Sequence, residues 1–177
     1  MMNRGSITTN RGSTLRDRVL KLTICLWLPL AAWQPAAAAV TFSCTVAASP
    51  LTFGVYPAYS AAPVTATGTF SVTCTATGSG SATVSGTLSL STGSSGQFAT
   101  RTMKAGTSVL DYNIYVSPAY SQIFGDGTAG TYQLSESGTV TAGQVYQVGG
   151  ALYGLIPARQ DVAPGSYLDT IVMTVVY

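Results

Sequence analysis

The chain has 177 residues, of which 8% are charged and none is histidine, and its formal net charge is +2. Five of the eight basic residues precede residue 22, and the remainder of the chain holds three cations and five acids, a net charge of −2. This remainder offers no basic patch for nucleic-acid phosphates, and without histidine it lacks the usual general base of nucleophilic hydrolases.

Residues 1–39 are predicted to be a secretory signal peptide. A basic start is followed by an apolar run over residues 22–33 and by four alanines at 36–39, which is the order of segments in a signal for export. The apolar run is too short for a bilayer span, which needs about 20 residues. We expect cleavage after Ala37 or Ala39, a mature domain of residues 40–177 exported through the periplasm, and no stable membrane span afterwards.

Short strands with alternating apolar residues follow one another along this domain. The first is expected at residues 40–46, and an apolar stretch at 51–56 precedes a loop at 58–67. Further strands are expected at 69–76, 83–91, 109–116, 131–134, 138–140 and 144–156. Gly86 and the Gly149-Gly150 pair are expected to bulge or bend their strands, and residues 92–96 to form a flexible tip. No segment has a helical period, so the pattern predicts an all-β sandwich with almost no helix.

Two cysteines, Cys44 and Cys74, remain once the signal peptide with Cys25 is removed. An even number of cysteines in an exported protein indicates a disulfide, and the alternative is a pair of buried thiols. Chain entropy assigns a closed loop of this length roughly 3.5 kcal/mol of stabilisation.

Residues 125–130, GDGTAG, match the glycine spacing of a dinucleotide-binding loop, but a strand pattern follows instead of the required helix. We interpret them as a glycine-rich turn. The five acids are scattered and no group resembles a metal site, so we expect no enzyme activity and no cofactor. The ten tyrosines leave a sugar-binding surface open as an alternative, although most lie in strand patterns.

The last stretch, residues 166–177, is the most apolar strand pattern of the chain. One face is predicted to carry Tyr167, Ile171, Met173, Val175 and Tyr177, with Asp169 as its single charge. The other face is also largely apolar, so we expect both faces to be covered. Because an apolar strand edge invites another strand, we expect this edge to be closed internally or by a partner.

Several stretches together resemble the spore coat protein U domain family, which includes subunits of archaic chaperone–usher pili. They are LTFGVY at 51–56, TFSVTCT at 69–75, LSLSTG at 88–93, LDYNIY at 110–115, FGDGT at 124–128, YGLIPA at 153–158 and PGSYLDT at 164–170. Phe124 stands where the family commonly has tryptophan. The resemblance implies an immunoglobulin-like sandwich that lacks its final strand, with the edge of Tyr167, Ile171, Met173, Val175 and Tyr177 accepting a strand from a chaperone or a neighbouring subunit.

The resemblance makes the first hypothesis a structural or adhesive subunit of a surface fibre, with a periplasmic chaperone, an outer-membrane usher and other pilus subunits as partners. Only residues 40–43 precede Cys44 in the expected mature chain, too few to donate a strand of roughly ten residues, so a place at the fibre tip is expected. The alternative is a self-contained, secreted, spore-coat-like structural protein. A secreted enzyme or sugar-binding module is the third hypothesis, which the missing histidine and dispersed acids disfavour.

Overall fold

The computed structural model describes residues 39–177, so the expected signal peptide lies outside the described residues except for Ala39. The described part has eight strands, one short 3-10 helix, η1 (Gly93–Ser95), and no α-helix. Within it no helix is long and apolar enough to cross a membrane. The strands are β1 (Thr41–Ala48), β2 (Val64–Thr77), β3 (Ser81–Leu90), β4 (Arg101–Ala105), β5 (Ser108–Tyr115), β6 (Leu134–Thr141), β7 (Val145–Ile156) and β8 (Met173–Val176).

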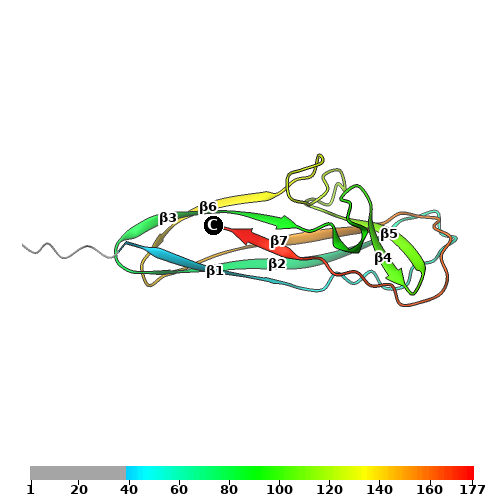
Figure 1. Ribbon diagram of the computed structural model, residues 1–177, viewed down its shortest axis with the longest axis horizontal. Helices are drawn as coiled ribbons and strands as arrows, with labels where there is room; N and C mark the ends of the chain where they lie inside the picture. Colours follow the sequence, from blue (N-terminus) through cyan, green and yellow to red (C-terminus); the bar gives the residue numbers. More distant parts are fainter. Residues whose placement is uncertain (1–38) are drawn as a thin grey trace, which may run out of the picture. The chain divides into compact units, whose positions relative to one another are not determined.

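The strands form two antiparallel sheets. One has the order β1-β2-β7-β5-β4 and the other the order β6-β3-β8 (Figure 1). Alternation explains which side chains lie between them, because successive residues of a strand point to opposite faces. The buried side chains of β2 are Ala66, Phe70, Val72, Cys74 and Ala76, and those of β3 are Val84, Leu88 and Leu90. The predicted all-β sandwich is confirmed.

The predicted disulfide joins β1 to β2. Cys44 and Cys74 are register partners, with an S–S distance of 2.03 Å and a Cα–Cα distance of 4.0 Å. Every residue of β1 pairs with β2, so the bridge fastens the first strand of the domain to a long central strand.

The glycines expected to bulge or bend their strands form no bulges. The β2–β7 register runs without interruption through Gly149 and Gly150, and the β3–β6 register runs through Gly86. These glycines allow close approach instead: a Cβ on Gly150 would lie 2.9 Å from the ring of Phe70, and one on Gly86 would lie 3.0 Å from the Val176 carbonyl oxygen. The absent side chain makes room for a neighbour, which sequence alone does not distinguish from a bulge.

Element boundaries differ from expectation in four further places. Residues 64–67, predicted as loop, begin β2. Of the strand predicted at 131–134 only Leu134 is strand, and it belongs to β6 together with the strand predicted at 138–140. The expected flexible tip at 92–96 contains η1, where the Ser95 hydroxyl donates to the Thr92 carbonyl at 3.0 Å. Only residues 173–176 of the predicted strand at 166–177 are strand.

Candidate strand-accepting edge

β8 is an edge strand with one side unpaired. It pairs antiparallel with β3 through the partners Thr87–Val176, Leu88–Val175, Ser89–Thr174 and Leu90–Met173, and no other strand of the described chain pairs with it. Across the sandwich β8 lies near β1, the edge strand of the other sheet. The two sheets therefore approach each other along two edges that both have free main-chain groups.

The hydrogen-bond pattern shows which groups of β8 are free. The Ser91 N–H donates to the Val172 carbonyl at 2.9 Å, and hydrogen-bonded pairs recur at every second residue of an antiparallel ladder. The pairs Ser89–Thr174 and Thr87–Val176 are therefore the hydrogen-bonded ones. It follows that the N–H and C=O groups of Met173 and Val175 point away from β3, toward the free edge.

The five residues predicted for this edge do not all lie on β8. Met173 and Val175 are half-buried strand residues, and Tyr177 follows directly after them. Ile171 is half-buried beside Gly93 of η1. Tyr167 lies before the strand, where its hydroxyl donates to the Ala163 carbonyl at 2.6 Å. The structure brings Met173, Val175 and Tyr177 together at the edge, with Ile171 at its start and Tyr167 outside it.

Residues 166–172 cross from one sheet to the other, which is why the strand is short. Leu168 exchanges two main-chain hydrogen bonds with Lys104 of β4, at 2.9 and 3.1 Å, whereas Val172 already bonds to Ser91 after β3. The expectation that both faces would be covered is wrong. Leu168, Val172 and Val176 are 75%, 59% and 62% exposed, because no layer of the described chain lies over that face.

Asp169 holds this crossing segment. Its carboxylate accepts hydrogen bonds from the Ser94 N–H at 2.9 Å, the Thr170 N–H at 2.8 Å and the Tyr112 hydroxyl at 2.7 Å. Burial and the hydrogen bond to Asp169 raise the pKa of the Tyr112 hydroxyl well above its ordinary value. The hydroxyl therefore remains a donor, and Asp169 connects the lead-in of β8 to η1 and β5.

Arg101 is fully buried beside this contact. Its guanidinium donates to the Ser91 carbonyl from Nε at 3.0 Å and from Nη2 at 2.8 Å, to the Asn113 side-chain oxygen at 2.7 Å and to the Phe124 carbonyl at 2.7 Å. Burial lowers the pKa of Arg101, and the nearby charge of Asp169 partly opposes that shift. The guanidinium joins the ends of β3 and β5 to the 117–133 loop, so it fixes the strand against which β8 pairs.

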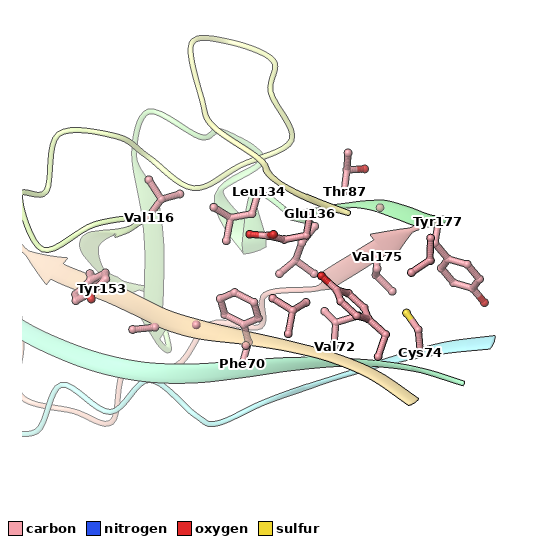
Figure 2. Close-up of a pocket in the computed structure, with 18 residues that line it drawn as sticks. Phe70, Val72, Cys74, Thr87, Val116, Leu134, Glu136, Tyr153, Val175 and Tyr177 are labelled. Carbon is pink, nitrogen blue, oxygen red and sulfur yellow. The ribbon is translucent and has the colours of Figure 1, made fainter. Parts of the chain in front are cut away.

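A cavity of about 270 Å³ lies between the sheets behind β8. Figure 2 shows Phe70, Val72, Leu134 and Val175 around it, with Tyr177 at one end. Its other lining residues come mainly from β3, β6 and β7, including Gly86, Glu136, Gly149 and Gly150. A cavity of this size is unusual for a core, because protein interiors pack as densely as organic crystals. Space for additional side chains is therefore present next to the free edge of β8.

Sequence reasoning missed Arg101, Asn113 and the role of Asp169. One signal was available for Arg101, which lies two residues before the apolar Met103 and so shares its face of the strand. Residues 125–130 form the expected glycine-rich turn, with the Asp126 carboxylate accepting a hydrogen bond from the Thr128 N–H at 2.9 Å. Hydrogen bonds from Thr128 lower the pKa of Asp126.

Two packed antiparallel sheets, with the last strand paired on one side only, are consistent with an immunoglobulin-like β-sandwich. The chain belongs to the Spore Coat Protein U domain family, whose model matches residues 31–174. No curated protein matches the chain in sequence. Among solved structures it is similar to a chain in the crystal structure of the CsuC–CsuE chaperone–tip adhesion subunit pre-assembly complex from archaic chaperone–usher Csu pili of Acinetobacter baumannii. The identity is 20% and the TM-score 0.48, over 77% of this chain and 40% of that chain.

Proposed function

We propose that this protein is a structural or adhesive subunit of a secreted surface fibre, completed at β8 by a strand from another protein. A periplasmic chaperone would supply that strand first and a neighbouring fibre subunit would supply it later, with an outer-membrane usher assembling the fibre. The role is structural rather than catalytic, and the route is export through the periplasm to the cell surface. The partner class comes from the resemblance to chaperone–usher subunits in this family.

The unpaired edge of β8 in front of the inter-sheet cavity is the observation that carries the proposal. A strand added there can hydrogen-bond to the free main-chain groups of Met173 and Val175. Its alternate side chains would point toward the cavity of about 270 Å³. At the cost measured for enclosed core cavities, this volume corresponds to roughly 6.5 kcal/mol, which is an upper bound because the cavity is open at the strand edges. Tyr177, with its half-exposed side chain beside Gly86, would be an anchor for the partner.

The proximity of β1 and β8 favours a second candidate, a self-contained coat protein whose sheets close on each other without a partner. The two candidates make opposite predictions about the free N–H groups of β8. A closed monomer would not pair these N–H groups with another strand, whereas a strand-accepting subunit binds its partner through them.

Proline at position 175 tests the proposal. Val175→Pro removes an N–H that points to the free edge and leaves the hydrogen bonds to β3 in place. Val175→Ala is the matched control, since it also shortens the side chain but keeps the N–H. Both variants would be co-expressed with a periplasmic chaperone of the chaperone–usher class, and the complex isolated on the tagged chaperone. We expect Val175→Ala to co-purify with the chaperone and Val175→Pro to be lost from the complex.

Both variants must first show cooperative unfolding and an intact Cys44–Cys74 bridge. Equal recovery of the two folded variants would refute strand addition at β8 and favour the self-contained coat protein.

A further inference from the structure

A second unpaired edge lies on the opposite side of the three-stranded sheet. β6 pairs with β3 alone. Because Ser89 and Thr87 of β3 bond to β8, Leu88 and Gly86 bond to β6 at Leu134 and Glu136. The main-chain groups of Ser135 and Ser137 therefore point to a free edge. Facing β6, the first half of β7 is also unpaired on that side, since β5 pairs only with residues 153–155.

This second edge borders the same cavity as β8. Leu134 and Glu136 of β6 line the cavity together with Gly149 and Gly150 of β7. Only one side-chain hydrogen bond of the described chain joins β6 to β7, and it runs from the Tyr146 hydroxyl to the Ser137 carbonyl at 3.4 Å. Free main-chain groups and an unfilled core would therefore make β6 as suitable a place for an added strand as β8.

Glu136 distinguishes the two edges. Residues 134, 136, 138 and 140 share one face of β6, and on that face Leu134 is half-buried and Val140 is buried. Glu136 thus carries its carboxylate on the inner face, beside the cavity (Figure 2). Within residues 39–177 this carboxylate has no hydrogen bond or ion pair, and Glu136 is exposed to water because the edge is open. The corresponding positions of β8, Met173 and Val175, are apolar.

A strand that joined β6 would place a side chain directly beside this carboxylate. Glu136 lies at a position whose main-chain groups bond to β3, so a partner residue across the free edge would be about 4.5 Å away, Cα to Cα. An apolar partner side chain would remove water from the carboxylate and offer it no hydrogen bond. Charged residues that point inward on an edge strand are a known defence against edge-to-edge pairing.

We propose that Glu136 prevents strand addition at β6 and so restricts an incoming strand to β8. The strand that it excludes most directly is β6 of a second copy, since an antiparallel β6–β6 pair would bring two Glu136 carboxylates onto one inner sheet face. The inference rests on the proposed function only in naming β8 as the productive edge.

Replacing the charge by an apolar side chain of strand-forming type tests this inference. The purified, oxidised protein would be compared with its Glu136→Val variant by sedimentation over a concentration series. We expect the unmodified protein to remain monomeric and the variant to dimerise at least about tenfold more tightly. Glu136→Asp keeps the charge and should remain monomeric. Ser135→Val adds the same side chain to the outer face of β6 and should also remain monomeric.

Amide hydrogen exchange would locate the contact, with new protection at Ser135 and Ser137 expected in the Glu136→Val dimer. A monomeric Glu136→Val variant, a Ser135→Val variant that dimerises equally, or protection at β8 instead of β6 would each overturn the inference. Glu136→Thr provides a second, less apolar replacement if the valine variant does not fold. Because these experiments contain no chaperone, their failure is separate from failure of the Val175→Pro test.

Discussion

Replacing Asp169 with alanine should loosen the C-terminal strand while the rest of the sandwich stays intact. The substitution leaves the buried Tyr112 hydroxyl without its acceptor. The Ser94 and Thr170 N–H groups also lose their bonds but are exposed to water. One lost bond from a buried hydroxyl to a charged group gives a loss of about 2 kcal/mol. The loss should be concentrated in residues 168–176, which Asp169 connects to η1 and β5.

The free energy of unfolding would be measured with urea, and the local effect by native-state amide exchange. Thr174 and Val176, whose amides bond to β3, should lose protection before the amides of β2 and β7 do. Asp161→Ala is the control, because it removes the same charge from an exposed position of the same segment and should change stability by less than about 0.5 kcal/mol. Equal effects of the two substitutions would refute the reasoning, since the hydrogen bonds would then contribute nothing.

Gly93 offers an independent check of the Asp169 contact. It has a φ of 68°, and a Cβ there would overlap the Asp169 carboxylate. Gly93→Ala should therefore destabilise the unmodified protein more than it destabilises the Asp169→Ala variant, because the double variant retains the backbone strain but not the overlap. Additive effects would contradict the contact.

Two further predictions concern the disulfide and alkaline pH. Cys74→Ser should lower stability by about 3.5 kcal/mol through loss of the bridge to Cys44, and two alkylatable thiols in the unreduced native protein would contradict the bridge. Burial raises the pKa of Tyr112 in the folded protein. The stability that this shift provides is therefore fully present below the unfolded pKa of about 10 and is lost as the pH rises through the folded pKa. Tyr112→Phe should therefore lessen the decline of stability above about pH 10, and an unchanged pH profile would count against the raised pKa.

The core of the fold could be predicted from sequence because it depends on local alternation. Phe70, Val72, Cys74 and Ala76 occur at every second position, and this places them on one face whatever the strand order is. The disulfide followed from the cysteine count and the expected export. Strand order does not follow from such patterns, because it depends on pairing between distant residues.

The details of the site escaped prediction for the same reason. Residues 166–172 have the alternation of a strand, and nothing in them shows that Leu168 pairs with β4 while Val172 bonds to the end of β3. The burial of Arg101 requires carbonyl groups from Ser91 and Phe124, ten and twenty-three residues away. Residues 135–137 were predicted as a break between two strands, so Glu136 could not be assigned to the same strand face as Gly138.

The central claim, that β8 accepts a strand, is tested most directly by the amides of Met173 and Val175. Both N–H groups point to the free edge, whereas those of Thr174 and Val176 bond to β3. Amide exchange of the isolated protein should therefore show fast exchange at 173 and 175 and slow exchange at 174 and 176. Binding of the chaperone, or of a donor-strand peptide from a neighbouring subunit, should slow the exchange at 173 and 175. Unchanged exchange at these two amides in a bound complex would contradict the account.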